Sequence, residues 1–246
     1  MNRWRSAPAG AAPAIRSELP PRTAATTAGL GLLAMALVSA LSFAAFNMLV
    51  VQDPARTARN IAEHEAAFRA LTCGFLVVAV LDVLVAWALY ELLAPVNKSL
   101  ALLAAWLRVM YAAVFAAVLS NLLVAVRLLT DATVRGAFDP RQADAQAVAS
   151  VHAFKDGWDT ALVIFGLHLL VLGYLVLRSG YVPRTLGVLL MIASTGYVVD
   201  GLGRLLSRDY HANVAGFTFV GEVLLMVWLL WKGRRLPDPA TAPAPV

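Results

Sequence analysis

Four ionisable side chains lie near the centres of long apolar runs: Asp82, Arg108, His168 and Glu222. With a helix rise of about 1.5 Å per residue, Arg108 lies roughly 15 Å from the polar turn at Lys98, half the depth of a hydrocarbon layer about 30 Å thick. The other three lie at similar depths. A charge there is costly, so such residues pair with one another, bind a ligand or carry a proton.

Asp82 and Arg108 belong to two neighbouring apolar runs that are joined by the short polar turn at residues 94–98. The two runs therefore form an antiparallel hairpin, and its arms carry opposite charges at similar depth. We predict that Asp82 and Arg108 form an ion pair. Two interpretations remain open: a structural pair that holds the hairpin together, or part of a site for a ligand or a proton.

Glu222 has no oppositely charged residue within its own run, and His168 is the group at a similar depth that could hydrogen-bond it. An imidazole can donate to a carboxylate or carry the proton itself. The sequence therefore suggests a proton shared between Glu222 and His168. The alternative is that His168 is a core histidine whose ring is satisfied by its neighbours.

Asp200 is a fifth candidate for a ligand or proton site, near the outer end of its apolar run. Arg204 follows four residues later, and residues at this spacing are neighbours on one helical face. We therefore expect an Asp200–Arg204 ion pair. The same spacing predicts a pair between Lys155 and Asp159.

His152, Asp156 and Asp159 share one helical face, and two carboxylates with one imidazole could bind a divalent ion. No second histidine follows at a diagnostic interval, so we expect no metal and no cofactor, and keep this trio only as an alternative. The sequence also lacks a phosphate-binding loop, a nucleophile elbow and a His-Glu-x-x-His motif. No catalytic residue is assigned.

The elements that must position these side chains are membrane-spanning helices. The chain of 246 residues is 60% hydrophobic and 14% charged, whereas soluble domains are about 45–50% apolar and about 25% charged. The apolar residues form runs of about 20 residues or more, and only helices or closed barrels satisfy the backbone in lipid. We predict an all-α polytopic membrane protein with six transmembrane helices, at residues 28–51, 67–93, 99–130, 160–177, 185–205 and 213–231.

Segments outside the six spans have their own signatures. The tails at residues 1–27 and 234–246 are rich in Pro and Ala and are expected to be disordered, flanking a transmembrane domain at 28–233. Asp53-Pro54 and Asp139-Pro140 each place an N-cap before a proline at the first helical position. We therefore expect amphipathic helices in the outer loops after spans one and three.

Close packing between spans is indicated by small residues, such as Gly166 and Gly173, which lie a heptad apart. The segment Ala40–Ala44 resembles a signal-peptide cleavage site, but the apolar run continues to Val51, so we expect an uncleaved anchor. The single cysteine, Cys73, allows no intrachain disulfide.

The net charge of +5 is distributed over short loops and tails, as a membrane-topology signal requires, and not over one basic face. We therefore expect no nucleic-acid partner. The basic residues before the first span and after the last place both termini in the cytoplasm, in a bacterial inner membrane. The predicted partners are the lipid bilayer and a small molecule or proton; the sequence does not define an oligomeric state.

Several stretches together resemble a bacterial integral-membrane family classed as a domain of unknown function, DUF4386. The resemblance covers most of the chain from Asp53 to Gly233 and implies a six-helix bundle, but no activity. All five ligand or proton candidates fall within it, which favours them over His152 and Asp156. The resembling stretches are FRALTCGFLVVAVLDVLVAWALYELLAPVNKSLALLAAWLR, FGLHLLVLGYLVLRSGYVPRTLGVLL, GYVVDGL and GEVLLMVWLLWKG.

The function predicted from the sequence is binding of a small ligand or a proton by the midplane polar cluster, in a carrier, a sensor or an accessory protein. Two alternatives come from other classes. The chain could be a membrane-embedded enzyme that acts on lipid, with the outer acids and His152 holding a metal. It could also be a structural subunit whose buried charges serve only assembly.

Overall fold

The computed structural model describes residues 19–207 and 209–236, and these residues form helices joined by turns and short loops. Six helical stretches are long and apolar enough to cross a membrane, as predicted; α4–α5 count as one stretch and α9–η1 as another. The elements are α1 (Pro21–Leu49), α2 (Pro54–Glu63), α3 (Glu65–Leu93), α4 (Lys98–Val118), α5 (Ser120–Thr130), α6 (Ala132–Arg135), α7 (Pro140–Ser179), α8 (Arg184–Leu206), α9 (Ala215–Thr218), α10 (Val220–Trp231) and the 3₁₀ helix η1 (Gly233–Arg235).

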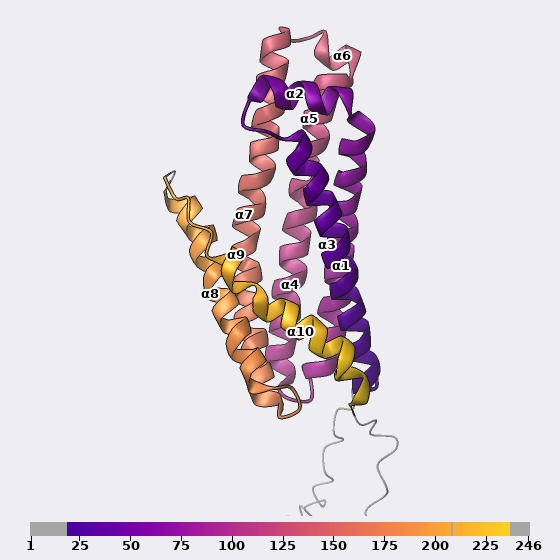
Figure 1. The fold of residues 1–246 in the computed structure, drawn as a ribbon, viewed down its shortest axis with the longest axis vertical. Helices are drawn as coiled ribbons and strands as arrows, with labels where there is room; N and C mark the ends of the chain where they lie inside the picture. Colours follow the sequence, from indigo (N-terminus) through magenta and orange to yellow (C-terminus); the bar gives the residue numbers. More distant parts are fainter. Residues whose placement is uncertain (1–18, 208, 237–246) are drawn as a thin grey trace, which may run out of the picture.

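Four long helical rods, α1, α3, α4–α5 and α7, stand side by side as the main bundle (Figure 1). Helix α8 packs along the lower half of α7 and leans away from the bundle at its far end. Helix α10 crosses the front of the bundle diagonally, from α8 to the start of α1 (Figure 1). This crossing helix brings Glu222 of the last span over the centre of the bundle.

The boundaries of the bundle differ from the predicted ones at both ends. Helix α1 begins at Pro21 rather than at residue 28, because proline is well suited to the first helical turn and Ala24, Ala25 and Ala28 are buried in the bundle. At the other end η1 extends to Arg235. The remaining parts of the predicted tails, residues 1–18 and 237–246, lie outside the described residues.

The helix predicted after the third span is present, but it is continuous with the fourth span. Helix α7 runs for 40 residues, and Asp139 caps it by accepting a hydrogen bond from the Arg141 amide. No proline interrupts the sequence before Pro183, and Gly157 packs beneath Val118, where a side chain would clash. The polar half of α7 therefore extends the rod beyond its apolar half.

The helix predicted after the first span is α2, which lies across the far end of the bundle (Figure 1). The Asp53 carboxylate caps it as expected, accepting from the amides of Ala55 and Arg56. The Asn60 side chain donates to the carbonyl of Leu49 at 3.0 Å and ties α2 to the end of α1. A bend at His64 separates α2 from α3.

Helices α7 and α8 cross closely along a row of small residues. A Cβ built on Gly173 would lie 2.8 Å from the Gly187 carbonyl oxygen, and one on Gly166 would lie 3.1 Å from that of Ser194. One on Gly201 would lie 3.0 Å from the Asp159 carbonyl oxygen. These backbone contacts leave no space for side chains, which confirms the packing role predicted for Gly166 and Gly173.

Substituting Gly173 by Val is expected to destabilise the protein by about 1–3 kcal/mol, because the backbone of α8 cannot move aside as a flexible side chain can. Thermal unfolding of the purified protein in mild detergent measures the effect. Ala145→Val, which adds a branched side chain at an exposed position of the same helix, is the control. Equal melting temperatures for the two variants would contradict the close crossing.

The turn between α7 and α8 is fixed by a side chain that reaches back to α3. Gly180 ends α7 in the left-handed conformation, with φ of 74°. The Tyr181 hydroxyl donates to the Leu92 carbonyl at 2.5 Å, and burial raises the pKa of Tyr181 to about 12, so the donor proton is retained at neutral pH. The lower end of α8 is thereby held against the hairpin that carries Asp82 and Arg108.

Candidate functional site

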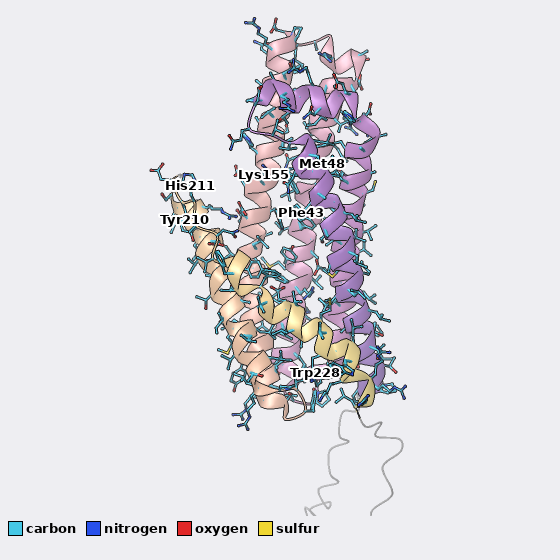
Figure 2. The ribbon with its side chains drawn as sticks, in the orientation of Figure 1. Phe43, Met48, Lys155, Tyr210, His211 and Trp228 are labelled. Atoms are coloured by element: carbon cyan, nitrogen blue, oxygen red, sulfur yellow. The ribbon has the colours of Figure 1, made fainter. Side chains whose placement is uncertain are left out.

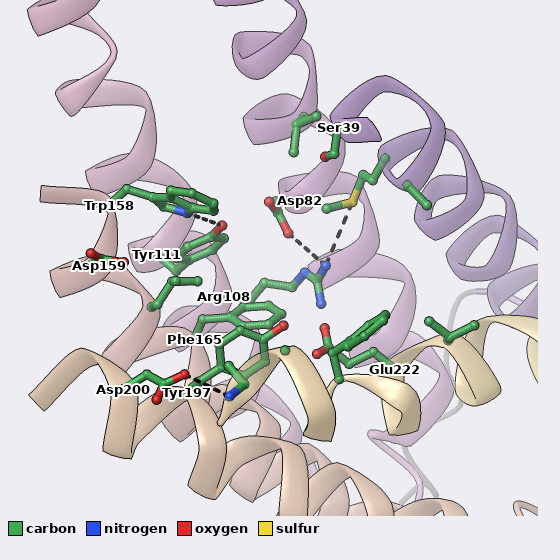
Figure 3. Close-up of a pocket in the computed structure, with 18 of the residues that line it drawn as sticks. Ser39, Asp82, Arg108, Tyr111, Trp158, Asp159, Phe165, Tyr197, Asp200 and Glu222 are labelled. Atoms are coloured by element: carbon green, nitrogen blue, oxygen red, sulfur yellow. Dashed lines mark hydrogen bonds and ion pairs between the residues drawn. The ribbon is translucent and has the colours of Figure 1, made fainter. Parts of the chain in front are cut away.

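A cavity of about 560 Å³ opens at the centre of the bundle, between the main rods, α8 and the crossing helix α10 (Figure 3). Four of the predicted polar residues, Asp82, Arg108, Asp200 and Glu222, contribute to its lining. Most of the remaining wall is apolar. The sequence-predicted residues from α3, α4 and α10 therefore meet in one space.

Asp82 and Arg108 form the predicted ion pair. Asp82 Oδ1 lies 2.7 Å from Arg108 Nη2, and the two side chains are 0% and 3% exposed. The guanidinium makes three further contacts: Nη2 lies 3.8 Å from the Met35 sulfur, Nη1 lies 3.3 Å from His168 Nε2, and Cζ lies 5.4 Å from the centre of the Phe165 ring. Arg108 is thus held from α1, α3 and α7 at once (Figure 3).

Both ring nitrogens of His168 have hydrogen-bond partners on α4, and neither is bonded to Glu222. Its Nδ1 lies 2.8 Å from the Ala104 carbonyl oxygen, which can only accept, so Nδ1 carries the proton. Nε2 is then a lone-pair acceptor for the Arg108 N–H. The predicted proton sharing between His168 and Glu222 is therefore wrong. His168 instead contacts Arg108, through Nε2.

Glu222 projects from α10 toward the guanidinium of Arg108, with Tyr197 of α8 beside it (Figure 3). Among the described residues, Glu222 Oε1 has no hydrogen-bond partner, nor do Asp82 Oδ2 and Arg108 Nε. Buried polar atoms are nearly always hydrogen-bonded, so three such atoms around one cavity require an explanation. With all three side chains ionised the cluster carries two negative charges and one positive charge.

Asp200 has a different environment from the three central residues. Its Oδ1 accepts from the Tyr210 hydroxyl at 2.7 Å and the Val214 amide at 3.0 Å, and its Oδ2 accepts from the Ala215 amide at 2.8 Å. The hydrogen bond to this carboxylate raises the pKa of Tyr210. Asp200 therefore anchors the loop after α8 and caps α9, which positions the α10 helix.

The predicted Asp200–Arg204 and Lys155–Asp159 pairs are both wrong, because each partner finds a closer one on another element. Arg204 of α8 forms an ion pair with Asp159 of α7. Lys155 lies 5.4 Å from the ring centre of Phe46 on α1. Sequence spacing identified residues of one helical face but not the helix that faces them.

The Asp159–Arg204 pair separates the central cavity from a second, more polar cavity of about 530 Å³. Both residues line both cavities. The second cavity also includes Asp156, Tyr210 and His211, and Figure 2 places the last two at the far end of α8. An outer polar space thus meets the central one across a single ion pair.

The alternative metal site is not assembled. His152 and Asp156 are exposed, and Asp159 pairs with Arg204. Within residues 19–207 and 209–236, no group of three His, Cys, Asp or Glu side chains has an arrangement that could hold a metal ion.

Sequence reasoning missed the aromatic side chains that wall the cavity: Tyr111, Phe165, Tyr197, Phe219 and Trp158. Trp158 donates to the Tyr111 hydroxyl at 3.4 Å, and the Phe165 ring centre lies 4.9 Å from that of Tyr111. A usable signal exists, because an aromatic residue lies three positions from each predicted polar residue of α4, α7, α8 and α10. Residues three apart share a helical face, so each such aromatic lies beside its polar neighbour.

Comparisons with known proteins place the fold in a family but add no activity. The model of a domain of unknown function, DUF4386, matches residues 27–233, which confirms the resemblance inferred from the sequence and includes the whole cavity. An uncharacterized protein of Archaeoglobus fulgidus is 36% identical over 170 residues, which are 69% of this chain and 88% of that protein. No solved structure matches the chain.

Proposed function

We propose that this chain, which belongs to the DUF4386 family of domains of unknown function, binds a small molecule or a proton in its central cavity and acts as a carrier or a sensor. The observation that carries the proposal is that Asp82 and Glu222 both line the cavity, and that Asp82 Oδ2 and Glu222 Oε1 have no hydrogen-bond partner among the described residues. Such oxygens are acceptors that a ligand or a proton can use.

A purely structural cluster would leave fewer polar atoms without a hydrogen-bond partner. Buried ion pairs that only hold helices together satisfy their remaining lone pairs with neighbouring donors, because an unsatisfied polar atom costs about 1–3 kcal/mol. His168 and Asp200 meet that description, since each is hydrogen-bonded on two sides. Asp82 and Glu222 do not, and both border a cavity large enough for a small molecule.

The proposed location is the cytoplasmic membrane, with both termini on the cytoplasmic side. The start of α1 and η1 pack together, so both ends of the described chain lie at one end of the bundle (Figure 1). The same end carries the turns with Lys98, Arg178 and Arg184, and basic residues favour the cytoplasmic side.

A thermal-shift screen of the detergent-purified protein against metabolites, lipids and a range of pH tests the binding proposal. A compound present at 100 times its dissociation constant stabilises the native state by about 2.7 kcal/mol. The Glu222→Gln variant is expected to fold normally but to lose most of this shift, because its amide keeps the shape and removes the charge. Glu63→Gln, an exposed position of α2 that makes the same charge change, is expected to keep it.

The proposal fails if no compound and no change in pH alters the melting temperature of the parent protein differently from that of Glu222→Gln. A positive screen then separates the two roles. Reconstitution into proteoliposomes and measurement of flux of the bound compound identifies a carrier, and binding without flux identifies a sensor.

A further inference from the structure

We infer that the central cavity takes an organic cation: a protonated amine attached to an apolar, preferably aromatic, body. The inference rests on the proposed binding function and adds the chemical class of the ligand. It follows from the charge balance of the cavity, from which of its polar atoms are free, and from the chemistry of its walls.

The charge of the central cluster favours a cation. Asp82 and Glu222 supply two negative charges and Arg108 supplies one positive charge, so the ionised cluster carries a net charge of −1. A charge that is not compensated in an apolar interior is strongly unfavourable. One bound positive charge brings the cluster to neutrality, whereas an anion would raise the imbalance to −2.

The polar atoms that lack a hydrogen-bond partner also favour a cationic ligand. Arg108 already directs Nη1 to His168 and Nη2 to Asp82, and only its Nε is unpartnered among the described residues. An anionic ligand would therefore find a single free N–H on Arg108, and any further hydrogen bond would draw the guanidinium away from Asp82 or His168. Two carboxylate oxygens, in contrast, are free to accept from a ligand N–H, and an ammonium group offers up to three donors.

The walls of the cavity suit the rest of such a ligand. Tyr111, Trp158, Phe165 and Tyr197 come from three helices and surround the polar cluster (Figure 3). Aromatic faces attract cations by about 0.5–2 kcal/mol and also pack against apolar groups. The volume of about 560 Å³ is within the range of roughly 300–1,000 Å³ found for small-molecule sites.

The charge of the outer cavity also favours the approach of a cation. Asp156 and Asp159 line it together with Arg204 and His211, and the Arg204 charge is neutralised by its ion pair with Asp159. Among the described residues, the Asp156 carboxylate of the outer cavity has no ion-pair partner. Clefts with an excess of one charge concentrate ligands of the opposite charge.

Three probes of matched size test the inference: 2-phenylethylamine, which is a cation at neutral pH, 2-phenylethanol, which is neutral, and phenylacetate, which is an anion. Quenching of tryptophan fluorescence measures their binding to the detergent-purified full chain. Trp158→Phe identifies the signal that comes from the cavity. The amine is expected to bind at least roughly tenfold more tightly than the alcohol, as one hydrogen bond between charged groups would give.

The same preference for amine over alcohol is expected to vanish in Glu222→Gln and to persist in Glu63→Gln. Equal binding of the amine and the alcohol to the parent, tighter binding of phenylacetate, or no binding of any probe would overturn the inference. The first two results would leave a binding cavity in place, so they reject the ligand class and not the proposed function. Loss of both the probe signals and every shift in the wider screen would reject both.

Discussion

Replacing Asp82 alone by Asn is expected to destabilise the protein by about 3–5 kcal/mol, the typical cost of removing one partner of a buried ion pair. Arg108 is 3% exposed and its Nη2 lies 2.7 Å from Asp82. The remaining contacts of the guanidinium, to His168 and to Met35, carry no negative charge, and Glu222 forms no ion pair with it in the described part of the chain. Unfolding by heat or denaturant in mild detergent measures the loss.

The double variant Asp82→Asn with Arg108→Met is expected to recover most of that loss, because neither member of the ion pair is then left buried without its partner. Recovery separates a charge effect from a packing effect, since two substitutions at one site would otherwise add. Glu63→Gln serves as the control for removing an acid from an exposed position. A single variant as stable as this control, or a double variant less stable than either single one, would contradict the ion pair.

Asp200→Ala is expected to cost about 2–3 kcal/mol, because three hydrogen bonds to its carboxylate and the cap of α9 are lost together. The donors are Tyr210, Val214 and Ala215, which all lie between α8 and α10. Hydrogen exchange of residues 210–222 is expected to accelerate more than that of α3 or α7. The crossing helix would then hold Glu222 less firmly.

Asp144→Ala, a carboxylate on the outer half of α7, is the matched control for Asp200→Ala. It removes the same charge without touching the loop after α8. If hydrogen exchange of residues 210–222 were the same in both variants, the anchoring role of Asp200 would be excluded.

Much of the fold follows from the sequence because it depends on length and apolar pattern. The six spans, the caps at Asp53 and Asp139, and the close crossing at Gly166 and Gly173 are all local features of single helices. The continuous path of α7 was missed because its polar first half looks like a surface helix. Nothing in the local pattern distinguishes a polar helix that lies on the bundle from one that prolongs a span.

The sequence predicted how deep in the spans the site residues lie, but not which neighbours their side chains face. Counting residues from the polar turns placed Asp82, Arg108, His168 and Glu222 near one level, and the hairpin made the Asp82–Arg108 pair predictable. The partners of His168 could not be predicted, because they depend on how α7 is rotated against α4.

Ion pairs between distant elements were missed for the same reason. Asp159 and Arg204 are 45 residues apart and meet only because α8 folds back along α7. The i,i+4 partners suggested by the sequence lie on a shared face, but tertiary packing supplied better partners.

The central claim is that Asp82 and Glu222 border a ligand site and are not part of a closed scaffold. An experimental structure of the protein with its tightest-binding screened compound tests this most directly. We predict that the compound lies in the central cavity, with a polar atom within hydrogen-bonding distance of Glu222 Oε1 or Asp82 Oδ2. A compound seated only on the outer, lipid-facing surface, or a cavity filled by rearranged protein side chains that satisfy both carboxylates, would contradict the claim.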